Sequence, residues 1–318
     1  MQETPTQKPD SGLLVRDMVI GNGCILLATI FFGVNIPIVK ELVPHWMSAD
    51  AVTAVRLIGG CALMWLASLF IRTEPIEGGD WTRLFFGGAV GLFSFMYLFN
   101  LSLRYADPID VSIIMTLPPV FVVLYHIIFQ RARPALLEYI GIAASFAGAV
   151  LVILCGHDNA GSHNLLGELL ALASTICYAF YLVVMEEPSK KYRPLSTLRW
   201  VFLFAALPAL LLLPQLIHSH LIQGHAGTLP WVWIGFILLC PTFLSYFLIA
   251  PADRLIGSEL VSIYQYLVPV VAAVASVIMG IARIIPVQIA AMAVIIGGMV
   301  ATNIGKRRRK QSLQRRPQ

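Results

Sequence analysis

Ten apolar runs, each long enough to cross a lipid bilayer as a helix, follow one another along this chain. They lie near residues 19–39, 49–71, 84–103, 109–129, 135–155, 165–185, 196–217, 229–251, 255–280 and 286–304. A transmembrane helix needs about 20 mainly apolar residues, so ten spans with short connections use almost all of the 318 residues. The composition agrees, because 58% of the residues are hydrophobic and 12% are charged. We therefore predict an all-α membrane protein without a separate soluble domain.

The basic residues predict the orientation of these spans, because Lys and Arg near helix ends are retained on the cytoplasmic side. If the N-terminus is inside, 17 of the 22 Lys and Arg residues fall on the inner side, and the outer segments hold only Lys40, Arg104 and Arg283. We therefore expect both termini in the cytoplasm. The basic run Lys306–Lys310 directly follows the last span, which favours an anchor against anionic lipid over a nucleic-acid site.

An internal repeat relates the two halves of the chain. An offset of 150 pairs residues 104–151 with 254–301 without a gap and gives 13 identities, among them Arg104/Arg254, Ser112/Ser262 and Pro119/Pro269. Each half then holds five spans, and because five is odd, the second half enters the membrane from the opposite side. We expect two inverted five-helix repeats, which is a recurrent design of secondary transporters. The predicted division is a tail at 1–18, repeats at 19–155 and 156–304, and a basic tail at 305–318.

Three motifs carry a family resemblance: Phe32-Gly33-Val34-Asn35 in the first span, Arg56 in the second, and the repeated Ser, Leu and Pro of the fourth and ninth spans. In this the chain resembles the EamA family of the drug/metabolite transporter superfamily, over residues 19–304. The resemblance implies a bacterial inner-membrane exporter of amino acids or other small metabolites that works by alternating access. Many relatives carry Gly-Glu near the end of the fourth and ninth spans, and this chain does not, so no role is transferred to that Glu.

Arg56 is the most deeply placed charged residue in the predicted spans, about seven residues from the start of the second. A charged side chain at such depth is costly and marks a functional site or a buried partner. One hypothesis is contact with a substrate carboxylate, which its planar guanidinium suits. The other is a structural tie to backbone carbonyls, or to Glu138 or Glu168. Arg199 lies closer to its helix end, where its guanidinium can reach the surface.

The fourth span carries a polar stripe with a proline at its centre. Ser112, Thr116, Pro119 and His126 recur at steps that put them on one helical face. The ninth span repeats the stripe as Ser262, Tyr266, Pro269 and Ser276. Proline frees a carbonyl and bends the helix, which membrane proteins tolerate beside a cavity. We predict that these faces form the cavity wall, that Pro119 and Pro269 act in gating, and that His126 either carries a coupling proton or packs through a hydrogen bond.

Other candidate substrate contacts are aromatic and amide side chains, which combine an apolar face with a hydrogen-bonding tip. They come from the spans that line the cavity in proteins this chain resembles, and they are Asn35, Tyr97, Asn100, Tyr178, Tyr181, Tyr246, Tyr264 and Gln265. The remaining six histidines fall in outer segments without metal-ligand spacing, and the five cysteines form no CxxC pair. We expect neither a metal nor a cofactor.

Small residues on the fifth and tenth spans, Ala143, Ala147, Gly297 and Gly298, permit close helix contact. They fit the seam of a homodimer, and a monomer fits the sequence equally.

The predicted function is a secondary transporter that exports a small metabolite such as an amino acid, with membrane lipid as its surroundings. Within the same fold, the alternatives are drugs, nucleosides, vitamins and sugar phosphates. An alternative from another class is a membrane-embedded enzyme. Its carboxylate pair would have to be Glu186-Glu187 or Asp107/Asp110, and neither pair has a catalytic partner at a productive spacing.

Overall fold

A computed structural model describes residues 11–43, 45–129, 135–155, 165–223, 227–256 and 258–314. These residues form helices and contain no strand. The helices that build the bundle are α1 (Ser11–Leu42), α2 (Ala49–Phe70), α3 (Trp81–Phe85), α4 (Phe93–Tyr105), α5 (Pro108–Ile114), α6 (Pro118–Phe129), α7 (Leu136–Cys155), α8 (Leu165–Val184), α10 (Pro194–Ala209), α11 (Leu213–Ile217), α12 (Thr228–Leu239), α13 (Ser245–Ile256), α14 (Ser258–Gln265), α15 (Val268–Ile278) and α16 (Pro286–Gln314). Short helices in the connections are η1 (Gly78–Asp80), α9 (Glu186–Lys191) and η3 (Leu210–Leu212).

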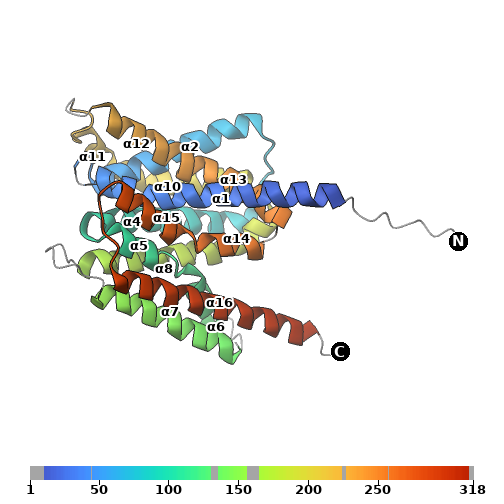
Figure 1. Cartoon of the computed structure of the whole chain (residues 1–318). Coiled ribbons are helices and arrows are strands. Elements are labelled where there is room, and N and C mark those ends of the chain that lie inside the picture. Colours follow the sequence, from blue (N-terminus) through green and yellow to red (C-terminus); the bar gives the residue numbers. More distant parts are fainter. Residues whose placement is uncertain are drawn as a thin grey trace.

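The bundle is built for a lipid environment. Within the described ranges, nine helical segments are long and apolar enough to cross a membrane. Large apolar side chains cover its outer surface, and Leu69, Phe70, Leu211 and Ile278 are among the most exposed. Exposing such a surface to water would be costly, whereas lipid tails are as apolar as these side chains and can cover them. The chain is therefore a multi-pass membrane protein, and both termini leave the bundle at the same end (Figure 1).

The prediction of ten continuous spans is wrong for the ninth, which is divided between α14 and α15 around Tyr266 and Leu267. The fourth span is divided at the equivalent place, between α5 and α6. Pro119 and Pro269 lie just after these breaks. Proline lacks an N–H group, and its ring clashes with the preceding turn. The backbone just before each proline therefore forms hydrogen bonds that span three residues instead of four, such as Leu117 N to Ile114 O at 3.1 Å and Leu267 N to Tyr264 O at 3.0 Å.

A second feature that the halves share is a widened turn in the third and eighth spans. η2 (Phe86–Leu92) joins α3 to α4, and η4 (Cys240–Leu244) joins α12 to α13, both with π-helical bonding. Such turns are rare and occur mostly as single insertions in α-helices. In η4, the Thr242 hydroxyl follows the wider spacing and donates to Ile237 O at 2.7 Å.

Helix pairing follows the same internal relation. α2 packs on α10 and α7 on α16, so the second and fifth spans each meet their own counterparts. α4 packs on α8 and α13 on α1, which are also equivalent pairs once the halves are exchanged. Figure 1 shows α7 and α16 side by side along one face of the bundle. The helices of each half therefore pack against equivalent helices of the other half.

The contact between α7 and α16 depends on glycine. A Cβ on Gly298 would lie 2.6 Å from Gly141 O and 2.6 Å from Ser145 Oγ, so only glycine fits without a shift. A Cβ on the neighbouring Gly297 would meet nothing within 4 Å. Ala143 and Ala147 are exposed as well. The small residues of these helices thus divide into an internal contact and an outer face.

Candidate functional site

A cavity of about 170 Å³ lies where the broken spans meet the rest of the bundle. Its wall is formed by α1, α2, α4, α8, α13, α16 and both broken spans, which together contribute Phe32, Asn35, Ile36, Arg56, Phe95, Met96, Phe99, Ser112, Met115, Thr116, Pro118, Pro119, Tyr178, Pro241, Tyr246, Gln265, Tyr266, Val268 and Met299. The two halves of the chain therefore share one cavity.

Arg56 is the only charged residue among the described residues that line this cavity. Its side chain is buried, with 5% of the residue exposed. Nε donates to Thr242 Oγ1 at 3.1 Å, whereas Nη1 is buried and has no hydrogen-bond partner in the described part of the chain. The structure thus shows a structural tie of Arg56, to a hydroxyl on η4, and it also leaves one guanidinium donor available for a substrate. An unpaired donor on a buried cation is costly unless a ligand or water satisfies it.

Aromatic rings form one wall beside Arg56. The Tyr178 ring lies 4.6 Å from Phe95, and Tyr246 packs edge-on against Phe202 at 5.9 Å. Tyr246 is also close enough to Arg56 to interact with it electrostatically. These rings offer flat apolar surface with a phenol tip, which suits a small solute with an apolar part.

The broken spans contribute polar atoms to the opposite part of the wall. Ser112 and Thr116 donate to Ile109 O and Ile113 O, at 2.6 and 2.7 Å. Their hydroxyl oxygens therefore remain free to accept a hydrogen bond. Asn35 adds an amide whose buried Oδ1 has no partner among the described residues. A cation, two acceptor hydroxyls and an amide together can bind a solute that has both a negative group and a donor.

Nine of the predicted site residues line the cavity: Asn35, Arg56, Ser112, Thr116, Pro119, Tyr178, Tyr246, Gln265 and Tyr266. Others lie elsewhere. Asn100 Nδ2 donates to Thr53 Oγ1 at 2.9 Å, and Tyr97 stacks on Phe93 at 6.0 Å. The hydroxyl of Tyr264 donates to Asn22 Oδ1 at 2.8 Å.

Tyr181, Pro269 and His126 also lie outside the described cavity wall. Tyr181 is buried behind Tyr178, with the two rings stacked at 5.8 Å. Pro269 is buried at the start of α15. Ser262 is in α14, and its side chain lies outside the part of the structure that is described. His126 lies 3.6 Å from Glu186 near the end of the bundle that carries the termini.

Some residues of the site were not anticipated from the sequence. Thr242, which holds Arg56, is one of several threonines in apolar runs, and only its place on η4 distinguishes it. Phe32, Met96, Phe99 and Met115 also line the cavity. In an apolar span, such side chains look the same whether they face lipid, protein or a cavity.

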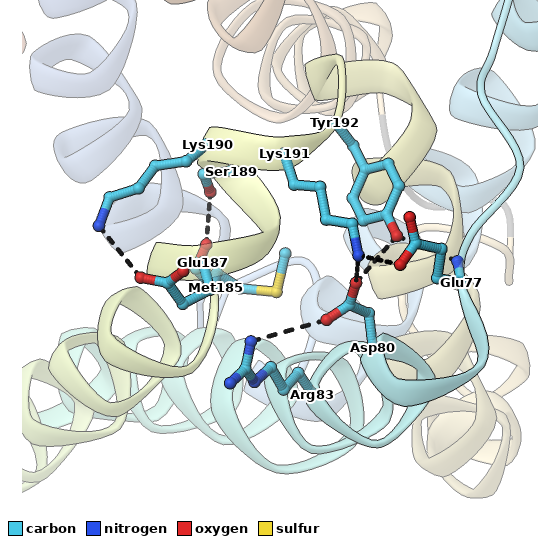
Figure 2. Close-up of polar contacts among 9 residues, drawn as sticks. All are labelled: Glu77, Asp80, Arg83, Met185, Glu187, Ser189, Lys190, Lys191 and Tyr192. Atoms are coloured by element: carbon cyan, nitrogen blue, oxygen red, sulfur yellow. Dashed lines mark hydrogen bonds and ion pairs between the residues drawn. The ribbon is translucent and has the colours of Figure 1, made fainter.

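A charged cluster joins the two halves at the end that carries the chain termini (Figure 2). Lys191 on α9 contacts Glu77 and donates to Asp80 Oδ2 at 2.8 Å, and Tyr192 donates to the same oxygen at 2.8 Å. Hydrogen bonds with Asp80, and then with Glu77, raise the pKa of Lys191 above its ordinary value. Arg193 pairs with Glu74 at 3.2 Å. The connections 71–80 and 185–193 are thereby tied together.

The contact at the opposite end of the bundle is apolar. There the connection between α1 and α2 and the segment that follows α11 contribute Val43, Met47 and Leu221 to the main core. Contacts between the halves therefore occur at both ends, through exposed ion pairs at one end and through apolar burial beside buried polar groups at the other.

The comparisons with known proteins agree with this architecture. The model of the EamA-like transporter family matches residues 19–154 and 165–304. The "Uncharacterized transporter YyaM" of Bacillus subtilis (strain 168) is 25% identical over 282 residues, covering 87% of this chain and 91% of that protein. "Uncharacterized transporter YdfC" of the same organism is 24% identical over 220 residues, or 69% of this chain and 70% of that protein.

A solved structure described as "Crystal structure of protein" has the same fold. It is 19% identical, with a TM-score of 0.59, and the match covers 91% of this chain and 98% of the other. The family match includes most of both halves, the helices are those of a multi-pass membrane protein, and the relatives carry transporter names. On these grounds, the chain belongs to the EamA-like transporter family.

Proposed function

We propose that this protein is a secondary transporter that exports small carboxylate-bearing metabolites, amino acids above all, by alternating access. The observation that carries the proposal is the free Nη1 of Arg56, which is buried at a cavity shared by both halves. A carboxylate is the natural partner for a buried guanidinium, because the pair forms charge-assisted hydrogen bonds.

The size of the cavity limits the solute. A volume of about 170 Å³ is close to that of an engineered protein cavity of about 150 Å³ that binds benzene. This favours a small metabolite over a drug-sized one. A sugar phosphate would call for more than one cation, and Arg56 stands alone in the described lining. The described lining also contains no carboxylate and no histidine, so it offers no acid–base pair of the kind that a membrane-embedded enzyme would use.

The orientation that fits this function places both termini in the cytoplasm of a bacterium, with the protein in its inner membrane. The excess of Lys and Arg on that side supports it. Two inverted repeats at 19–155 and 156–304 would then let the molecule exchange between conformations open to either side.

A ligand screen on the purified protein tests the substrate class. Amino acids and other small carboxylates at about 100 times their dissociation constant should stabilise the folded state by about 2.7 kcal/mol. The measurement is the melting temperature in detergent, with the corresponding amides and decarboxylated amines as controls. Stabilisation by the amines and amides, but not by the acids, would contradict the proposed role of Arg56.

Lys191 and Lys190 provide a matched test of alternating access. Lys191 bridges to Asp80 and Glu77 of the other half, whereas Lys190 pairs only with Glu186 and Glu187 of its own helix. Lys191→Gln should therefore open the cavity more often toward the end that carries the termini, and Lys190→Gln should not.

The measurement is the maleimide-labelling rate of Met115→Cys, a cavity position, after the five native cysteines have been replaced. We expect a several-fold increase for Lys191→Gln, because the variant removes both ion pairs of Lys191 with the other half. Equal labelling rates in the two lysine variants would mean that this cluster does not hold the cavity closed.

A further inference from the structure

A second group of ionisable side chains lies away from the cavity, at the end of the bundle opposite the termini. Asp107 and Asp110 lie at the start of α5, Glu168 lies near the start of α8, and Lys40 lies near the end of α1. Asp110 is 2% exposed and Glu168 is 4% exposed. Asp107 lies within electrostatic range of Lys40, of Asp110 and of Glu168, and Asp110 also interacts with Glu168.

The hydrogen bonds of this group leave one buried carboxyl oxygen without a partner among the described residues. Gln288 on α16 donates to Asp110 Oδ1 at 2.9 Å, and Asp107 accepts from Ile109 N at 2.8 Å. Lys40 donates to the backbone oxygen of Ala106 at 2.9 Å. Glu168 Oε2, in contrast, is buried with no partner among the described residues.

Packing holds Glu168 against this group. A Cβ on the preceding Gly167 would lie 2.5 Å from Ala106 N, so α8 touches the backbone just ahead of Asp107. On α4, the Arg104 guanidinium lies over the Tyr105 ring, 5.4 Å from its centre. Among the described residues, Asp107 therefore interacts with both Asp110 and Glu168, and Lys40 interacts with Asp107.

The charges in this group do not balance. Three ionised carboxylates beside one ammonium would leave two buried negative charges in excess. Burial and like-charge repulsion both favour the neutral form of a carboxyl group. For Asp107, which lies between two spans, burial raises the pKa, and the hydrogen bond from Ile109 and the charge of Lys40 oppose this only in part. A proton held within the group would remove part of this excess charge.

The fold itself does not require these acids. At the offset of 150 that aligns the halves, Asp107 and Asp110 correspond to Gly257 and Leu260. Glu168 corresponds to Asn22 at the offset that aligns Phe32 with Tyr178. The positions equivalent to these three acids thus carry no carboxyl group in the other half, so the internal repeat does not account for the group.

We propose that Asp107, Asp110, Glu168 and Lys40 form a proton-binding site that couples proton movement to solute transport, an inference that rests on the transport function proposed above. The link to the cavity is α5, which carries Asp110 two residues ahead of Ser112 and ends just before Met115 and Thr116 in the cavity wall. A proton from the solution at this end neutralises one carboxylate. It leaves to the other side when the halves rearrange, as the solute moves in the opposite direction.

The proton itself is the probe in the first test. Infrared difference spectra of the purified protein in lipid, taken between acidic and neutral pH, should show the carbonyl band of a buried protonated carboxyl group. Glu168→Gln and Asp110→Asn should each lose part of this band. Glu41→Gln, next to Lys40 in sequence but outside the group, should retain it. Both test variants preserve side-chain shape, and the amide oxygen introduced by Asp110→Asn would still accept a hydrogen bond from Gln288.

Loss of the band in either folded variant supports the site. No such band in the wild type, or an unchanged band in both test variants, would overturn it. The second test uses proteoliposomes with a mixture of radiolabelled L-amino acids. Glu168→Gln should keep solute exchange at equal pH and lose accumulation driven by a pH gradient, and retained accumulation would refute coupling. Absence of any wild-type exchange would instead count against the proposed substrate class, and the spectra would still decide the proton site.

Discussion

Arg56→Ala is expected to abolish transport in a protein that still folds and inserts. Removing one partner of a buried charged pair costs about 2–5 kcal/mol, so the loss of transport should be about 30-fold or more. The measurement is solute uptake into proteoliposomes at matched protein content. Arg56→Lys should fall between the wild type and Arg56→Ala, because lysine keeps the charge but cannot form two parallel hydrogen bonds.

Arg199→Ala serves as the control for Arg56. Its guanidinium lies over the rings of Trp65 and Trp200, 5.4 Å from each, and it does not belong to the described cavity wall. This variant should lose packing without losing a substrate contact. Wild-type uptake by Arg56→Ala would remove Arg56 from the site and leave its bond to Thr242 as its only role.

Gly298→Ala should strongly destabilise the protein, whereas Gly297→Ala should not. The added Cβ at position 298 meets backbone and side-chain atoms of α7 at 2.6–2.7 Å, and the one at 297 meets nothing. Overpacking of this kind costs about 1–3 kcal/mol or more, while glycine to alanine on an open helix face gains up to about 1 kcal/mol.

Melting temperature and monodispersity in detergent measure this difference between adjacent positions on one helix. Because the two substitutions are chemically identical and lie next to each other in one helix, helix propensity does not explain a large difference between them. Equal melting temperatures would show that α7 and α16 can separate slightly without loss of stability, contrary to the close contact described here.

The sequence predicted the class of fold well, because apolar runs of the right length leave few other solutions. It also located the prolines that interrupt the fourth and ninth spans. It predicted a bend where the ninth span is broken outright. The widened turns η2 and η4 were not predicted, since π-helical bonding leaves no pattern in an apolar stretch.

The candidate site was predicted only in part for a related reason. In a soluble protein, the polar face of a helix indicates its rotation, but lipid and protein interior are equally apolar here. Asn35 and Asn100 look alike in sequence, yet Asn35 lines the cavity and Asn100 binds Thr53. Tyr178 and Tyr181 differ by less than one turn, and only Tyr178 reaches the cavity. The sequence did not show how each helix is rotated about its own axis, and this rotation decides which of its side chains face the cavity.

Exposed ion pairs join the halves at the end of the bundle that carries the termini, whereas the groups that join them at the other end are mostly buried, so the solution acts on the two ends differently. Dissolved salt screens exposed ion pairs over a distance of about 10 Å at 0.1 M, which weakens the cluster around Lys191 and Asp80. Excluded salts such as sulfate strengthen apolar burial, and cooling weakens it, so the buried core around Met47 and Leu221 at the other end responds in the other direction. Ionic strength and temperature thus change, in different ways, which end of the carrier opens more readily.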